Sequence, residues 1–246
     1  MIFPANKYPW NNMIWLTAIL FGGGGVRLLY LWLHPMVTRD GITYINFCQN
    51  WFEQGNEALP SFLQTQPALL FYLGKLVMHW GIPAESSLLL INLVAGILLL
   101  IPVYMIGRLI FQAHPENALW LTGFAAVMPK LVEYSCSQLR ESLYFLFFTL
   151  VFCFWGYAIQ RIYLKWNASF CGLSILCAMQ CRYESLELLI FCFATLPLIL
   201  WKKHNFRTAL IGITFISIGI VMGITFFRCL PDMPDFWIIY RNRIGI

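Results

Sequence analysis

Charged side chains are scarce in this chain: only 11% of its 246 residues are Asp, Glu, Lys or Arg, whereas 60% are hydrophobic. A soluble domain usually carries about 25% charged residues, so the composition excludes a water-soluble globular fold. The formal net charge of +5 gives no ground for a nucleic-acid partner. The composition predicts an all-α, polytopic membrane protein, surrounded mainly by the lipid bilayer.

The sequence also lacks Cys-x-x-Cys pairs and any His, Cys and Asp cluster with the spacing of a metal site. Its eight cysteines are scattered, mostly within apolar segments, and are interpreted as small apolar residues. A disulfide between Cys48 or Cys136 and Cys229 is left open. Internal repeats, low-complexity tracts and linkers are absent as well, which predicts a single domain over residues 1–246.

Seven apolar segments are interpreted as membrane spans, on the basis that a spanning helix needs about 20 apolar residues. They cover approximately residues 13–33, 86–111, 118–132, 143–162, 168–181, 186–201 and 208–227. The first segment is too long for a cleaved signal peptide and is interpreted as a retained helix. Pro102 predicts a kink in the second segment. Arg27, near the end of the first, either reaches the membrane interface or faces a polar site.

Residues 35–83 form a predicted outer loop that carries short amphipathic helices instead of a span. In the first of these, residues 44–55, we expect Phe47, Trp51 and Phe52 on the membrane surface and Asn50, Glu53 and Gln54 facing water. The second, residues 67–80, is apolar over only about 14 residues and contains Lys75. It is therefore interpreted as a juxtamembrane or re-entrant helix.

The distribution of Lys and Arg predicts the orientation of the chain. If the N-terminus is cytoplasmic, the run 201–207 lies inside and gives the strongest positive-inside signal. The same topology leaves Glu116 as the only cytoplasmic acid. This separation of the acids is independent of the Lys and Arg distribution that predicts the orientation. Because the loops are short, we expect a bacterial inner membrane and not the endoplasmic reticulum.

Three short polar motifs meet at the outer face under this topology. The first is Arg39-Asp40 with Tyr44, the second covers residues 137–142 and the third covers residues 182–185. Charges near a membrane are costly and usually pair with one another or mark a functional path. Arginine can bind phosphate with two hydrogen bonds. A carboxylate can take a proton from a sugar hydroxyl or hold a divalent cation.

The order of these features resembles the GT-C superfamily of polyprenyl-phosphate-sugar-dependent glycosyltransferases, especially its dolichyl-phosphate-mannose–protein mannosyltransferase and aminoarabinose transferase branch. The matching stretches are DGITY (40–44), QPALLFY (66–72), HWG (79–81), IPVYMIGRLIF (101–111), LRESLY (139–144) and CRYE (181–184). Two features depart from the family: its doubled proline is reduced to Pro67-Ala68, and the loop acid is single instead of an Asp-Glu pair. The chain also ends early for this family, which predicts a truncated member.

The resemblance implies an inverting transfer of a sugar, at the outer face, from a polyprenyl-phosphate-linked donor to a hydroxyl of a protein, lipid or glycan acceptor. It implies Asp40 as the general base and Glu141 as a residue that orients an arginine or the acceptor. The remaining implied contacts are Arg140, Arg182, Lys75 and Arg39 for the donor phosphate, and Tyr44, Gln66 and Glu184 for the acceptor or sugar. Mg²⁺ or Mn²⁺ is left open as a cofactor.

Each of these residues also has a structural interpretation. Asp40 could cap the helix that follows it, Arg140 and Glu141 could pair at a helix start, and Arg182 could form an interfacial pair with Glu184. For the whole chain, the alternatives are a transporter or flippase of a lipid-linked substrate and a non-catalytic GT-C-like membrane subunit. A transporter would predict inverted repeats and helices broken at mid-membrane, and the sequence indicates neither.

Overall fold

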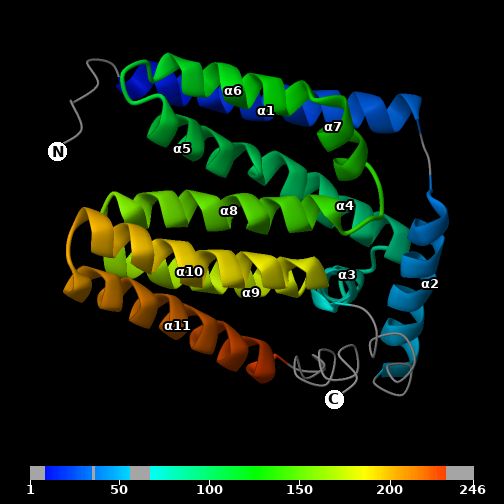
Figure 1. The fold of residues 1–246 in the computed structure, drawn as a ribbon. Helices are drawn as coiled ribbons and strands as arrows, with labels where there is room; N and C mark the ends of the chain where they lie inside the picture. Colours follow the sequence, from blue (N-terminus) through cyan, green and yellow to red (C-terminus); the bar gives the residue numbers. More distant parts are fainter. Residues whose placement is uncertain (1–8, 35–36, 56–66, 231–246) are drawn as a thin grey trace.

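The computed structural model describes residues 9–34, 37–55 and 67–230, and all regular structure in these ranges is helical. Most helices lie side by side as a bundle, while α2 (Arg39–Gln54) runs across one end of it (Figure 1). Five helical segments are long and apolar enough to cross a membrane: Asn12–Leu33, Ala84–Ile110, Glu141–Ile159, Tyr183–Lys203 and Phe206–Cys229. These segments indicate an integral membrane protein.

The second predicted span is one kinked segment. Its two halves, α4 (Ala84–Leu98) and α5 (Leu100–Ile110), meet at Leu99, whose backbone remains helical with φ −53° and ψ −31°. Pro102 has no N–H to donate to the carbonyl of Leu98, four residues earlier. The interruption therefore lies where the sequence predicts a kink.

The third predicted span, residues 118–132, is not continuous. Its first part is α6 (Glu116–Val127), which ends at Met128, and its second part is the short helix α7 (Pro129–Ser135). Met128 is extended, with φ −60° and ψ 118°, because the residue before a proline avoids the helical conformation. The prediction of a single helix here is wrong.

The remaining long helices build the two sides of the bundle. They are α1 (Pro9–Leu33), α8 (Glu141–Ile159), α9 (Leu164–Met179), α10 (Leu186–Lys203) and α11 (Phe206–Cys229). Helix α1 lies along α6, and α9 lies between α8 and α11 (Figure 1). With 16 residues, α9 is shorter than its neighbours, at about 24 Å.

Glycine brings the backbones of α9 and α11 into direct contact. A Cβ atom at Gly219 would clash with the carbonyl oxygen of Ser169, and one at Gly172 would clash with the carbonyl oxygen of Ile216. Small residues permit this kind of close helix approach in membranes. Gly25 in α1 is different, because a Cβ there would meet nothing within 4 Å.

We expect Gly219→Ala to lower the stability of the folded protein by about 1–3 kcal/mol, the usual cost of overpacking. The clash is with backbone, so no side chain can rotate away to relieve it. The midpoint of thermal unfolding in detergent measures the effect. Gly25→Ala is the matched control, and it should be neutral or stabilising by up to about 1 kcal/mol, because alanine favours a helix. A Gly219→Ala protein that unfolded at or above the wild-type temperature would contradict the α9–α11 contact.

Helix α2 packs one face against α3 (Leu69–Met78). Its buried face is formed by Tyr44, Phe47, Cys48 and Trp51, at the spacing of one side of a helix. The rings of Phe47 and Phe71 meet edge to face with centroids 4.9 Å apart. The expectation that Phe47 and Trp51 lie on the membrane surface is therefore wrong, because α3 supplies an aromatic partner. Phe52, Asn50, Glu53 and Gln54 are exposed, as predicted.

Arg27 joins α1 to the end of α6. Its side chain is fully buried, and Nη1 donates to the carbonyl oxygens of Gly23 at 2.9 Å and Ala126 at 3.0 Å. The last carbonyl groups of a helix have no partner within that helix. Arg27 therefore binds the carbonyl end of α6 just before the break at Met128, and the interpretation in which it reaches the interface is wrong.

All eight cysteines are free, so the disulfide left open from the sequence does not form. Seven of them are buried or partly buried, and only Cys229 is exposed. Burial raises the pKa of the Cys48 thiol to about 12. It also raises that of Cys136 to about 11, an increase that Arg27 opposes. These thiols therefore act as small packed side chains, as the sequence predicts.

Candidate active site

Thr38, and not Asp40, caps the first turn of α2. The Thr38 Oγ1 atom accepts a hydrogen bond from the backbone N–H of Gly41 at 3.0 Å, the usual geometry of an N-cap. Asp40 lies inside the first turn with an exposed side chain, where the helix dipole favours an anion. The interpretation of Asp40 as the cap is therefore wrong.

Gly41 allows α2 to approach the segment between α7 and α8. A Cβ atom at Gly41 would lie 3.2 Å from Oε1 of Gln138 and 3.5 Å from its Cβ. Gln138 is buried, and its Oε1 accepts no hydrogen bond from the described residues. This contact places the first turn of α2, with Asp40, beside the start of α8, which carries Arg140 and Glu141.

A disulfide can test this contact. In the double variant Gly41→Cys/Gln138→Cys, the two Cβ atoms would be about 3.5 Å apart, which suits a disulfide. We expect rapid crosslinking under mild oxidation, measured by the gel mobility of the chain after proteolytic cleavage between the two positions. Gly55→Cys/Gln138→Cys is the matched control, since nothing lies within 4 Å of a Cβ at Gly55. Equal crosslinking of both pairs would contradict the docking of α2.

Tyr44 lies where the charged residues of the three polar motifs converge. It follows Asp40 by one helical turn, so both residues lie on the same side of α2. Burial raises the pKa of the Tyr44 phenol; Arg140 and Arg182 oppose this increase, whereas Glu141 and Asp40 add to it. The Gly41–Gln138 contact brings this turn of α2 beside the start of α8, and the Arg182–Glu141 ion pair at 3.8 Å joins the start of α8 to the turn after α9. The structure thus brings together residues from α2, from the start of α8 and from the turn after α9.

Arg182 is held by two carboxylates and an aromatic ring. Its Nη1 lies 3.8 Å from Oε1 of Glu141, and its Nε and Nη2 each donate to Glu184 at 3.4 Å. The guanidinium carbon lies 5.5 Å from the centroid of the Tyr144 ring. Burial lowers the pKa of Arg182, but the hydrogen bond and charge of Glu184 and the charge of Glu141 outweigh it, so the net shift is upward. The guanidinium is therefore a fixed, permanent cation at this site.

The turn that carries Arg182 is also bound to α3. The backbone N–H of Leu69, the first residue of α3, donates to the carbonyl oxygen of Gln180 at 3.2 Å. The Gln180 side chain is buried, and its Nε2 makes no hydrogen bond to the described residues. One Glu141 oxygen, Oε2, is buried in the same way. The site therefore has polar atoms directed inward that are not used by the described part of the protein.

The other predicted site residues lie elsewhere or cannot be placed. Lys75 is buried, and its Nζ lies 5.2 Å from the centroid of the Trp51 ring, in the interface between α2 and α3. Arg39 is exposed at the first position of α2. Gln66 lies outside the described residues. The core of the site therefore consists of Asp40, Tyr44, Arg140, Glu141, Arg182 and Glu184.

Two contributors to the site are absent from the sequence-based predictions. Tyr144 follows Glu141 by three residues in α8, and residues three apart share a helix face, so that spacing could have indicated it. Gln138 lies within the second polar motif, but its contact with Gly41 joins segments far apart in the chain. Local spacing gives no signal for such a contact.

The described carboxylates do not form a metal-binding cluster by themselves. Among the residues that the structure describes, no group of three or more His, Cys, Asp or Glu side chains could hold a metal ion. Glu141 and Glu184 both face Arg182, whereas no ion pair among the described residues holds Asp40. Mg²⁺ is usually held by one or two carboxylates together with substrate phosphates and water.

Comparison with known proteins gives no relative: no family model, no curated protein and no solved structure matches this chain. The site is therefore interpreted from its own geometry.

Proposed function

We propose that this chain is a membrane glycosyltransferase of the GT-C type, which moves a sugar from a polyprenyl-phosphate donor to an acceptor hydroxyl. The observation that supports the proposal is the contact of three polar segments at one end of the bundle: Gly41 of α2 lies against Gln138, and Arg182 pairs with Glu141 at 3.8 Å. Two guanidinium groups at a membrane boundary suit a lipid phosphate. A nearby exposed carboxylate suits removal of a proton from a hydroxyl.

In this reaction the acceptor oxygen attacks the anomeric carbon of the sugar, on the face opposite the phosphate. The new carbon–oxygen bond forms as the bond from that carbon to the phosphate oxygen breaks, so the anomeric configuration inverts. Asp40 takes the proton of the acceptor hydroxyl. The electron pair of the broken bond remains on the lipid phosphate, whose developing charge is balanced by Arg140 and Arg182. Stabilisation of such a charge is often the largest part of catalysis.

The remaining residues have supporting roles. Glu141 orients Arg182 through their ion pair, and Tyr44 and Glu184 contact the sugar or the acceptor. Arg39, exposed at the start of α2, adds positive charge near the donor, whereas Lys75 lies in the interface between α2 and α3. The scheme is written without Mg²⁺ or Mn²⁺, and either ion could add its charge at the donor phosphate.

The chain direction supports seven crossings. Helices α8 and α10 both begin at the end of the bundle that carries the candidate site, so α9 has to return the chain between them (Figure 1). By the same reasoning, α6 and α7 together return the chain from the end of α5 to the start of α8. Both of these return segments are shorter than a usual span: α9 is a short helix, and α6 and α7 form a broken one. The remaining crossings are α1, α4–α5, α8, α10 and α11.

The direction of the chain through the bundle also supports an orientation of the protein in the membrane. The end of the bundle opposite the candidate site carries Arg108, Arg161, Lys165, Lys202, Lys203 and Arg207. The candidate-site end carries as many basic residues, so the proposed orientation rests on the dense run 201–207, which the positive-inside rule favours on the cytoplasmic side. The N-terminus is then cytoplasmic, and the candidate site faces outward from a bacterial inner membrane.

Reconstitution in liposomes with polyprenyl phosphates that carry different radiolabelled sugars tests the proposal. We expect the label to leave one of these donors, with release of free polyprenyl phosphate and inversion at the anomeric carbon of the product. Movement of an intact donor across the bilayer would support a flippase instead. Donor binding without bond cleavage, in the presence of membrane extracts that supply acceptors, would support a non-catalytic subunit.

A further inference from the structure

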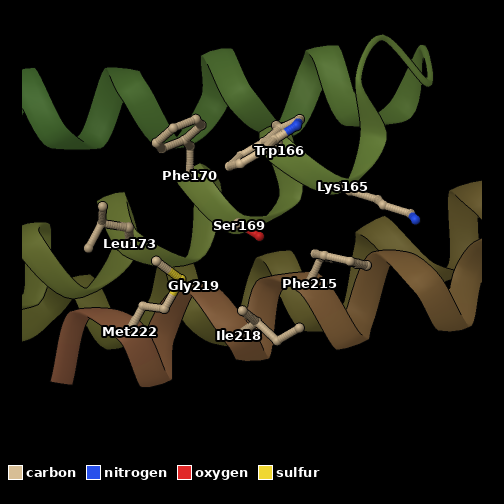
Figure 2. Close-up of a pocket in the computed structure, with 9 residues that line it drawn as sticks. All are labelled: Lys165, Trp166, Ser169, Phe170, Leu173, Phe215, Ile218, Gly219 and Met222. Carbon is tan, nitrogen blue, oxygen red and sulfur yellow. The ribbon is translucent and has the colours of Figure 1, made fainter. Parts of the chain in front are cut away.

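The bundle also has a groove between α9 and α11, away from the candidate active site. The groove encloses about 380 Å³. Figure 2 shows Lys165 at one end of it and Leu173 and Met222 at the other. Because a helix rises 1.5 Å per residue, the groove runs for about 12 Å from Lys165 to Leu173.

The walls of the groove are apolar, and its charge is confined to one end. Trp166 and Phe170 stack along α9 with ring centroids 6.3 Å apart, and both side chains are exposed. Lys165 is the one charged residue that lines the groove, and its Nζ lies 5.7 Å from the centroid of the Phe215 ring. An occupant must therefore be largely apolar, with an anionic group at the Lys165 end.

The shape of the groove favours a slender, flexible occupant over a helix. The small residues at its floor are already used, because Gly219 lies against Ser169 in the contact between α9 and α11. Helices that associate in a membrane usually need small residues for a close approach. The exposed positions left along this groove are large: Trp166, Phe170, Ile218 and Met222.

The surroundings of Lys165 extend the positive charge. Lys202 and Lys203 end α10, Arg207 lies in the first turn of α11, and Arg161 precedes α9. These residues lie at the same end of the bundle as Lys165. Basic residues at a membrane boundary attract anionic lipids.

We propose that the groove between α9 and α11 binds one acyl chain of an anionic membrane phospholipid, with the lipid phosphate at Lys165. The site differs from the candidate active site. Lys165 and Arg182 lie at opposite ends of α9, which separates the two headgroup positions by about 25 Å. The lipid therefore belongs to the opposite leaflet from the polyprenyl donor, and the inference does not depend on the proposed transfer reaction.

Native mass spectrometry of the purified protein in detergent tests this site, with phosphatidylglycerol and phosphatidylethanolamine as probes. We expect the wild type to retain one phosphatidylglycerol more strongly than phosphatidylethanolamine. Lys165→Gln should weaken phosphatidylglycerol binding about fivefold, the effect of one basic residue at a membrane surface. Ser169→Leu, which fills the middle of the groove, should weaken the binding of both lipids.

Lys202→Gln is the matched control, because Lys202 is exposed at the same end of the bundle but does not line the groove. It should reduce lipid retention much less than Lys165→Gln does, because Lys202 adds only to the surrounding positive charge, and thermal unfolding should confirm that each variant is folded. Retention of phosphatidylglycerol that is insensitive to both Lys165→Gln and Ser169→Leu would overturn the proposal. Equal loss in Lys165→Gln and Lys202→Gln would overturn it too, because it would indicate general charge attraction.

Discussion

Asp40→Asn is expected to reduce sugar transfer by about 10²–10⁴-fold, the usual contribution of a general base. The asparagine amide cannot accept the proton of the acceptor hydroxyl at neutral pH, whereas its size and polarity match those of aspartate. The fold should be retained, because Thr38 provides the helix cap and the Asp40 side chain is exposed. The release of polyprenyl phosphate from a labelled donor in liposomes measures the effect.

Glu53→Gln is the matched control for this prediction. Glu53 also lies on α2 and is exposed, but it is more than three turns from Asp40, and its Oε1 accepts a hydrogen bond from Gln49 at 3.0 Å. This variant should transfer sugar at the wild-type rate. Undiminished turnover in Asp40→Asn would remove Asp40 from the role of base and favour a base supplied by another residue or by the acceptor.

Arg182→Gln is expected to reduce transfer by about 10²–10³-fold, comparable to the loss of one group that stabilises a developing anion. Glutamine keeps polar contact with Glu141 and Glu184 but carries no charge to balance the departing phosphate. Arg182→Lys should recover only part of the rate, because an ammonium group lacks the two-pronged geometry that binds a phosphate. Single-turnover rates separate this effect on chemistry from an effect on donor binding.

Two further variants distinguish a chemical loss from a structural one. Arg182→Gln leaves Glu141, which is 20% exposed, without its ion pair, and a partly buried unpaired charge can disturb a fold. The double variant Arg182→Gln/Glu141→Gln removes that charge. If the double variant regained the wild-type rate, Arg182 would act only by neutralising Glu141. Arg207→Gln, exposed at the other end of the bundle, serves as the charge control and should be fully active.

The helices of this protein are largely predictable because lipid imposes a strict rule. A segment that crosses a bilayer must be helical and apolar, so hydrophobic length alone locates α1, α8, α10 and α11. Pro102 predicts the kink between α4 and α5. Pro129 marks the end of α6, but the length of an apolar segment does not tell whether its helix is kinked or completely broken. A complete break leaves backbone carbonyl groups without helical partners, so it depends on another group that binds them. Arg27, distant in sequence, provides that group.

The packing of α2 could not be predicted from its amphipathic pattern. The pattern identifies the face that carries Phe47 and Trp51, but lipid and protein are both suitable partners for an aromatic face. The partner is Phe71 of α3. The same limitation applies to Lys75, whose position over Trp51 depends on how two separate helices meet.

For the candidate site as well, the sequence identifies the residues but not how they are arranged. The sequence identifies Asp40, Arg140, Glu141 and Arg182 because charged residues stand out at the ends of apolar segments. Their mutual arrangement depends on contacts between distant segments, such as Gly41 with Gln138 and Leu69 with Gln180.

The buried arginine of α1 has a consequence for the order in which the chain assembles. The partner of Arg27 on α6, Ala126, comes 99 residues later in the chain. At a synthesis rate of about 5–20 residues per second, α1 is complete about 5–20 seconds before that partner exists. During this interval the guanidinium has only its own helix to bind, and a long basic side chain in that position can reach toward the interface. We therefore expect α1 to settle at its final depth only after α6 arrives and Ala126 can accept a hydrogen bond from Arg27.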